Sequence, residues 1–458
     1  MTRAPRVEGR RVRRLGLAAA LLTTVLLAAC DPPKPANDCA EIPGLDKWTW
    51  VGGATDSITN KAKWHHPGED GIGFPGARTE PAAAADDYVC VPDDRHLVIR
   101  DGQSMHIQVL DNQGTTEIIP GGRLDLEGND TDRISYSNIM VLQGMLAGPG
   151  TLTTVAGGEL HWQKTINGGT SMRSDEDLSP SAPPAKTVIA EGGTLRVSPG
   201  GVQLANLRTI VNHGTTQVVG NSAYIALDDG TSFVNLGTFD FLGDGDVLQG
   251  SFASPRDLPL FRNEGQVRKL SGGSGQSTFD VPFQRVAPGS QSVTAGRLGI
   301  WHDTSITASV ALGARFGTGA CGAGANATCT SPVLNGTQPQ FAEVQRATGA
   351  GSPATVSIAE VPGLGEPLTK GDPVDLTAPA ASNANPMTIR LGIDSTLTGG
   401  LAASALNVTH DGGANLPDCP ASLPIAGACV DRAASTGDAG DDVVMVVKTP
   451  SNGRWRIR

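Results

Sequence analysis

The chain has 458 residues, of which 59 are glycine and 31 are proline, while 4% are aromatic and 18% are charged. This composition excludes helical bundles, coiled coils and multi-span membrane proteins, because glycine and proline interrupt helices. The formal net charge of −11 disfavours nucleic acids and anionic polymers as partners. Glycine and proline instead separate short segments rich in Val, Thr, Leu and Ile, which predicts an all-β protein.

Residues 1–29 have the pattern of an export signal. Six arginines precede residue 15, and an apolar run extends from Leu15 to Ala29. The run is shorter than the ~20 residues that a membrane-spanning helix needs. It ends in Leu27-Ala28-Ala29-Cys30, which resembles the lipobox of bacterial lipoproteins. The resemblance implies that Cys30 becomes the N-terminus and carries acyl chains such as palmitate. The alternative is an ordinary signal peptide followed by a chance cysteine.

Residues 30–46 are rich in proline and are expected to form a tether between the lipid anchor and the folded chain. Several acyl chains on one cysteine hold a protein firmly at a membrane, whereas a single chain binds only marginally. Removal of the leader takes away six arginines and one glutamate, so the remaining chain is more acidic still. We therefore expect the protein on the extracytoplasmic face of the cell membrane, with the membrane as a partner and no nucleic acid.

Six cysteines follow Cys30, and an even number outside the cytoplasm favours disulfides. Six cysteines allow 15 connectivities. Proximity in sequence favours two pairs and leaves a third: Cys321–Cys329, Cys419–Cys429 and Cys39–Cys90. A zinc site is the alternative, but the chain has no Cys-x-x-Cys spacing and its histidines lie elsewhere. We therefore expect no metal and no other cofactor.

Residues from about 97 to 300 repeat a pattern of Gly-Thr followed by alternating apolar residues. Asn-x-Gly precedes the later repeats, beginning at Asn212, Asn235 and Asn263. Repeats of roughly 20–25 residues without a helix are typical of a parallel β-solenoid, in which each coil buries its apolar face against its neighbours. Asparagine and glycine are expected at the corners because both tolerate positive φ. Asparagine at a fixed corner can also stack into a ladder of side chains.

Two segments carry a resemblance to known β-helix proteins. Trp48-Thr49-Trp50, with Gly52-Gly53 and Lys63-Trp64, resembles the opening segment of secreted bacterial β-helix proteins, in which aromatic residues cap the open end of the core. The stretch from Phe261 to Phe283 contains Phe-Arg-Asn-Glu-Gly and Lys-Leu-Ser-Gly-Gly. It resembles a coil of adhesin-like bacterial surface proteins related to autotransporter passengers. The resemblance implies a single-stranded parallel β-helix over residues 47–301.

The remainder of the chain has a different pattern. Residues 302–345 are rich in Gly, Ala, Thr and Asn, which predicts a loop region. From residue 346, segments such as 387–394 and 443–447 alternate with period two, which predicts a small antiparallel β-sandwich over residues 346–458. This part resembles a C-terminal module of secreted bacterial multidomain proteins, which shares a Thr-Ala-Pro-Ala segment, a two-cysteine loop and a closing Trp strand.

Paired acidic residues are the candidates for catalysis. Polysaccharide lyases of this shape need acidic clusters for Ca²⁺, and glycoside hydrolases need two carboxylates at a set separation. The pairs flanked by glycine in the repeat region are Asp228-Asp229 and Asp244-Gly245-Asp246. Asp-Gly pairs are turn residues far more often than catalysts. The chain has no HExxH, GxSxG or P-loop motif.

These observations favour a lipid-anchored surface protein that contacts glycans or proteins of the cell envelope or the surroundings without catalysis. One alternative is a β-helix polysaccharide lyase or glycoside hydrolase that uses the acidic pairs. Another alternative is a rigid envelope spacer without a ligand. Acidic side chains gathered in a cleft beside Arg or Lys would favour the enzyme. Acidic side chains scattered over the corners would favour a binding protein or a spacer.

Overall fold

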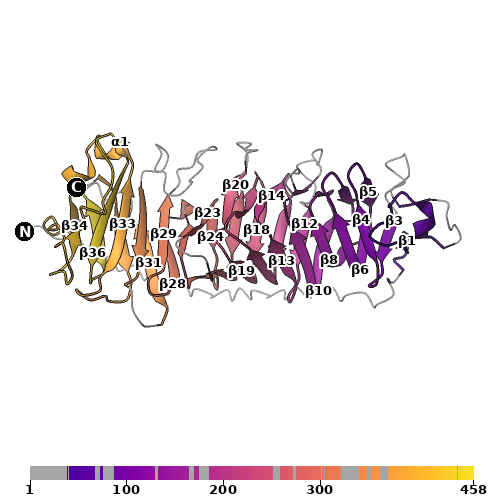
Figure 1. Cartoon of the computed structure of the whole chain (residues 1–458), viewed down its shortest axis with the longest axis horizontal. Helices are drawn as coiled ribbons and strands as arrows, with labels where there is room; N and C mark the ends of the chain where they lie inside the picture. The colour runs from indigo at the N-terminus through magenta and orange to yellow at the C-terminus, as the bar shows by residue number, and fades with distance from the viewer. Residues whose placement is uncertain are drawn as a thin grey trace, which may run out of the picture. The chain divides into compact units, whose positions relative to one another are not determined.

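The computed structural model describes residues 39, 41–67, 73–75, 87–128, 133–164, 170–174, 185–228, 230–250, 258–271, 275–300, 302–303, 305–320, 340–347, 352–361, 370–440 and 442–458. Within these ranges the strands form two sheets, of 22 and 15 strands, whose coils can be followed in Figure 1 by the change from indigo to orange. Most pairings are parallel, and the C-terminal ones are antiparallel. The predicted fold class, an all-β parallel β-helix with an antiparallel C-terminal part, is confirmed.

The parallel part of the larger sheet consists of two rows of strands. Three long strands take part in both rows: β6 (Val109–Ile118), β8 (Ser135–Leu142) and β10 (Thr151–Trp162). The first row also contains β1 (Asp46–Trp50), β3 (Asp87–Val91), β12 (Lys186–Ile189), β15 (Thr209–Asn212), β18 (Ser232–Asn235), β21 (Leu260–Asn263) and β24 (Phe283–Arg285). The second row also contains β4 (His96–Ile99), β13 (Thr194–Val197), β16 (Thr215–Val218), β19 (Thr238–Phe241), β22 (Gln266–Lys269), β25 (Ser290–Val293) and β28 (Ser305–Val310).

The smaller sheet supplies the third strand of each coil. Its parallel strands are β5 (Ser104–Ile107), β7 (Arg123–Leu126), β9 (Met145–Ala147), β11 (Ser171–Arg173), β14 (Gly200–Ala205), β17 (Ala223–Leu227), β20 (Asp246–Gln249), β23 (Gln276–Asp280), β26 (Arg297–Ile300) and β29 (Arg315–Ala320). One coil is β15, β16 and β17, and the next coil, β18, β19 and β20, pairs with it strand by strand. Apolar side chains at alternate positions join one continuous core.

A ladder of asparagine side chains joins successive corners inside this core. The amide of Asn212 donates to Asn235 Oδ1 at 2.8 Å, and the amide of Asn235 donates to Asn263 Oδ1 at 2.7 Å. All three side chains are fully buried. Each amide also donates to a backbone carbonyl, so the ladder pairs buried polar groups that would otherwise be costly. The expectation of an asparagine ladder is confirmed.

The glycines that follow these asparagines are required for a reason other than the predicted positive φ. None of Gly214, Gly237 and Gly265 has a φ in the left-handed region. A Cβ on Gly237 would lie 2.2 Å from the carbonyl oxygen of Gly214, and one on Gly265 would lie 2.0 Å from that of Gly237. Close stacking of one corner on the next therefore excludes a side chain here.

Aromatic residues fill the middle and the N-terminal end of the core. The rings of Phe233 and Phe261 stack with centroids 5.1 Å apart, and Phe283 continues the stack at 5.5 Å. At the N-terminal end, Trp50 is fully buried and its indole N–H donates to the carbonyl of His96 at 3.0 Å. Trp64 packs against Trp50 with centroids 4.8 Å apart. These tryptophans belong to the continuous core.

Both sheets continue directly into an antiparallel C-terminal segment, drawn in orange to yellow in Figure 1. Strand β28 pairs with β25 in parallel and with β31 (Ala354–Glu360) in antiparallel fashion. Strand β29 lies in the same way between β26 and β30 (Gln340–Gln345). The remaining strands are β32 (Lys370–Thr377), β33 (Met387–Ile393), β34 (Val408–His410), β35 (Cys429–Val430), β36 (Val443–Thr449) and β37 (Gly453–Ile457). The antiparallel strands thus cover the edges of the last parallel strands.

A few short elements complete the described chain: β2 (Trp64–His65), β27 (His302–Asp303), η1 (Lys61–Lys63), α1 (Ser395–Thr398) and η3 (Ala403–Ala405). Strands β27 to β30 fall within residues 302–345, where composition predicts a loop region. Glycine and threonine there occupy strand positions, as in Arg315-Phe-Gly-Thr-Gly-Ala320. Among the described residues, no helix combines the length and the apolar character needed to cross a membrane.

The asparagine ladder predicts a large effect for Asn235→Ala. The change removes hydrogen bonds to Asn263 and to the Gln266 carbonyl and leaves the Asn212 amide with one partner fewer. Each buried group left without a partner costs about 1–3 kcal/mol. We expect a clear drop in the midpoint of urea unfolding, and no comparable drop for Gln217→Ala, whose side chain is only partly buried. Equal midpoints for the two variants would contradict the structural role of the ladder.

Candidate functional site

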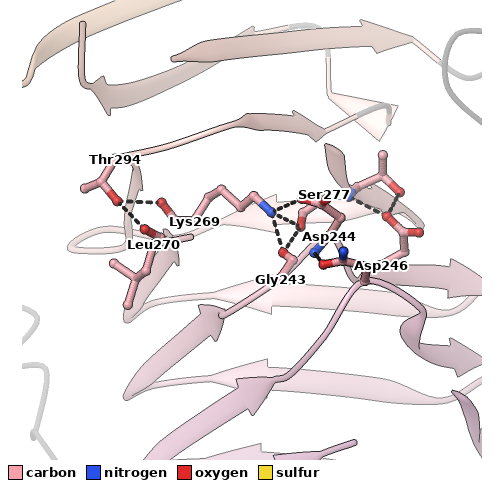
Figure 2. Close-up of polar contacts among 9 residues, drawn as sticks. Gly243, Asp244, Asp246, Lys269, Leu270, Ser277 and Thr294 are labelled. Carbon is pink, nitrogen blue, oxygen red and sulfur yellow. Dashed lines mark hydrogen bonds and ion pairs between the residues drawn. The ribbon is translucent and has the colours of Figure 1, made fainter. Parts of the chain in front are cut away.

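The predicted acidic pair Asp244 and Asp246 lies at the corner between β19 and β20, where it meets a buried lysine. Lys269, the last residue of β22, has a fully buried side chain. Its ammonium donates to Asp244 Oδ1 at 2.8 Å, to Ser277 Oγ at 3.1 Å and to the carbonyl of Gly243 (Figure 2). An ammonium group has three donors and no acceptor, so this corner satisfies all three donors.

The alternation of β22 explains why this lysine points inward. Val267 faces the core, so Lys269, two residues later on the same strand, faces it as well. The extended side chain then reaches from one coil to the corner of the preceding coil, as Figure 2 shows. The ion pair consequently fastens three separate segments of the chain: β22, the turn before β20, and β23.

Asp246 is held by a different partner from Asp244. Its Oδ1 accepts the backbone N–H of Thr278 at 2.8 Å and the hydroxyl of the same residue at 2.7 Å. Burial raises the pKa of the Asp246 carboxyl, although the hydrogen bonds from Thr278 and the charge of Lys269 act in the opposite direction. Asp246 therefore serves as an acceptor between neighbouring strands of the smaller sheet.

The corner leaves little room for a ligand. A Cβ on Gly275 would lie 1.7 Å from Asp244 Oδ2, so even a methyl group does not fit beside this carboxylate. The side chain of Asp244 is 17% exposed, and that of Lys269 is not exposed at all. A substrate would have to displace the turn to reach the amine. The arrangement is suited to holding coils together, because a buried ion pair needs every charge and donor satisfied.

Asp228, the described member of the other acidic pair, does not lie at the same place. Asp228 follows β17, while Asp246 stands opposite Tyr224 at the beginning of that strand. Four residues along a strand correspond to about 13 Å. Asp228 is buried, and its Oδ2 accepts the side-chain amide of Gln203 at 2.7 Å. Asp229 lies outside the described residues.

Arg208 is a second buried cation that joins neighbouring coils, at another corner. Arg208 is fully buried, and its guanidinium donates to the carbonyls of Lys186 at 3.0 Å and Gly148 at 3.1 Å, as well as to the Thr187 hydroxyl at 3.0 Å. These acceptors belong to different coils. Sequence analysis did not single out Arg208 or Lys269. The period-two pattern of β22 predicts that the Lys269 side chain faces the core.

Two of the predicted cysteine pairs are disulfides in the structure. Cys39 is bonded to Cys90 of β3, which attaches the first described residue to the first coil. Cys419 is bonded to Cys429 of β35 in the antiparallel segment. Cys321, Cys329 and the predicted lipidation site Cys30 lie outside the described residues. In the part of the chain that is described, no group of three or more His, Cys, Asp and Glu side chains is arranged to hold a metal ion.

A polar pocket of about 540 Å³ lies on the antiparallel segment. Arg454 of β37 forms a bidentate pair with Asp375 of β32, at 2.6 and 2.7 Å. The hydrogen bonds from Arg454 hold the pKa of Asp375 below its usual value. Both side chains are partly exposed, Arg454 by 33% and Asp375 by 42%. The pocket is therefore accessible, in contrast to the Lys269 corner.

Further side chains complete this pocket with both donors and acceptors. The lining also includes Thr377, Asp411, Asn452 and Arg456. Asp411 Oδ1 accepts the backbone N–H of Arg454 at 2.8 Å, which fixes the loop after β34 beside β37. Sequence analysis did not identify these residues, because the pairing of Asp375 with Arg454 depends on a register between strands far apart in the chain.

Comparison with protein-family models, with curated proteins and with solved structures finds no match for this chain.

The Lys269 corner predicts a strong effect for Lys269→Met. The variant leaves the buried Ser277 hydroxyl and the Asp244 carboxylate without their ammonium partner. Removal of one partner from a buried ion pair costs about 3–5 kcal/mol, and partial exposure of Asp244 favours the lower end. Urea unfolding followed by circular dichroism measures the loss. The matched control is Lys186→Met, whose side chain is exposed on β12, and similar unfolding midpoints for both variants would overturn this assignment.

Proposed function

We propose that this chain is a lipid-anchored protein on the extracytoplasmic face of a bacterial cell membrane that binds glycans or proteins without transforming them. Support for the anchor comes from the basic leader and the lipobox-like Leu27-Ala28-Ala29-Cys30. Support for a surface role comes from the resemblance of the repeats to adhesin-like proteins related to autotransporter passengers. The two disulfides fit an oxidising compartment.

The observation that carries the non-catalytic proposal is the engagement of the acidic residues in the corners. Asp244 is held by Lys269, Asp246 by Thr278 and Asp228 by Gln203. A catalytic carboxylate has to reach the substrate, and a hydrolase needs two of them on either side of one bond. Residues that fasten coils at separate corners do not meet this requirement.

The pocket on the antiparallel segment is the proposed contact surface. Sugar hydroxyls donate and accept hydrogen bonds, and the pocket offers carboxylates, guanidinium groups, an amide and a hydroxyl within one hollow. The pair of Asp375 and Arg454 is partly exposed and held in a fixed geometry. A fixed arrangement lowers the entropic cost of ligand binding.

Binding without turnover is tested with the full chain purified in detergent. The protein is incubated with immobilised neutral and acidic polysaccharides, with and without Ca²⁺, and both retention and release of oligosaccharides are measured. We expect retention and no release. We also expect Arg454→Ala to weaken retention about tenfold, since a charge-assisted hydrogen bond contributes about 1.5–3 kcal/mol.

The control for this experiment is Arg196→Ala, because Arg196 lies exposed on β13, away from the pocket. It should retain polysaccharide as the unchanged protein does. Release of oligosaccharides would establish the enzyme instead. If the protein shows no retention and no release, glycan binding is contradicted, and protein adhesion or a spacer role is left.

The anchor has its own test in Cys30→Ala. Without the thiol no acyl chain can be attached, so cells supplied with labelled palmitate should yield labelled wild-type protein and unlabelled variant. We also expect the variant to leave the membrane fraction. Cys39→Ala is the matched control, because Cys39 is engaged in a disulfide and should not affect labelling. Equal labelling of wild type and Cys30→Ala would rule out Cys30 as the anchor.

A further inference from the structure

Three arginines and one glutamate gather on the smaller sheet where parallel pairing changes to antiparallel. Arg297 of β26 stands opposite Arg315 of β29 in the parallel ladder. Glu343 of β30 stands opposite Arg390 of β33 in the antiparallel ladder. Side chains at such opposite positions lie on the same face of a sheet, about 4.5–5.5 Å apart at Cβ. The change of strand direction therefore creates a cluster that neither half of the fold contains alone.

The register shows how these four side chains come together. Arg297 forms an ion pair with Glu343, although they stand on strands that are not neighbours. The intervening strand β29 places Gly317 opposite Glu343, and Gly317 in turn stands opposite Gly299 of β26. Neither glycine carries a side chain, so nothing from these two positions separates Arg297 from Glu343.

The cluster holds three positive charges against one negative charge. Glu343 is 1% exposed and its carboxylate is engaged by Arg297. For Arg315 and Arg390, both partly buried, no hydrogen bond or ion pair is found within the described part of the chain. Burial lowers the pKa of Arg297; Glu343 opposes this shift, while the charges of Arg390 and Arg315 add to it. Two cationic charges are thus in excess in an otherwise acidic chain.

Three other cations on the described strands are each paired with a carboxylate. Lys448, which stands on β36 next to the same ladder, pairs with Asp431 at 2.7 Å. Arg268 pairs with Asp240 at 2.6 Å, and Arg454 pairs with Asp375 at 2.6 Å. Like charges brought together in a partly buried place repel one another unless a counter-charge joins them. The excess at Arg315 and Arg390 therefore calls for an anion.

We infer that Arg297, Arg315 and Arg390 form a binding site for a small oxyanion: a phosphate, a sulfate or the carboxylate of an acidic sugar. The planar guanidinium fork matches the oxygens of such anions and can bind them through two parallel hydrogen bonds. Glu343 holds Arg297 in position through their ion pair. This site is separate from the polar pocket and does not depend on the proposed function.

The test is titration calorimetry on the full chain in detergent, with inorganic phosphate, inorganic sulfate and glucuronate in separate runs at constant ionic strength in chloride. We expect saturable binding of at least one anion, and the three runs identify which group is recognised. Arg315→Gln and Arg390→Gln should each weaken binding about tenfold or more. Arg390→Lys keeps the positive charge and loses the guanidinium fork, so its anion affinity should lie between those of the glutamine variants and the wild type.

Arg196→Gln is the matched control and should bind as the wild type does, because Arg196 is exposed on a different sheet. The melting temperature of the wild type should also rise with the bound anion, which keeps the test decisive if a glutamine variant fails to fold. No binding above the chloride background and no rise in melting temperature would overturn the inference. Unchanged affinity in folded Arg315→Gln and Arg390→Gln would overturn it as well.

Discussion

The close stacking of one corner on the next is the constraint on which the rest of this structure depends. Each coil must approach its neighbour closely enough for continuous parallel pairing, and that distance leaves no space for a Cβ at Gly237 or Gly265. It also places Asn212, Asn235 and Asn263 within hydrogen-bonding distance of one another. The apolar core between the sheets depends on this stacking, because a single coil cannot bury its apolar face.

The partners of the buried charged side chains are also set by the close stacking of the corners. A lysine or arginine that reaches a neighbouring corner finds carbonyl, hydroxyl and carboxylate acceptors at fixed positions, as Lys269 and Arg208 do. Such groups hold coils in register but are unavailable to a ligand. The accessible pair of Asp375 and Arg454 lies in the antiparallel segment, and the arginines in excess, Arg315 and Arg390, lie where that segment joins the coils. Recognition is accordingly expected there rather than along the coil corners.

Sequence patterns predicted the parts of this fold that repeat. The spacing of Asn-x-Gly predicted the coils and the ladder, although glycine is needed for close approach and not for positive φ. The alternation of β22 predicts that the Lys269 side chain faces the core. This position was overlooked because lysine is rarely fully buried. The pairings Asp375–Arg454 and Arg297–Glu343 could not be predicted, since they depend on a register between strands separated by long stretches of chain.

We propose that the acidic corner formed by Asp244 and Lys269 stabilises the fold and takes no part in catalysis. Asp244→Asn tests it most directly, with the melting temperature and the behaviour toward polysaccharides measured on the same preparation. We expect a lower melting temperature for this variant, because Lys269 loses its charged partner. At temperatures where Asp244→Asn is folded, we expect it to retain polysaccharide as the wild type does. If the wild type releases oligosaccharides and Asp244→Asn does not, while the melting temperature of the variant is unchanged, the structural role of this corner is contradicted.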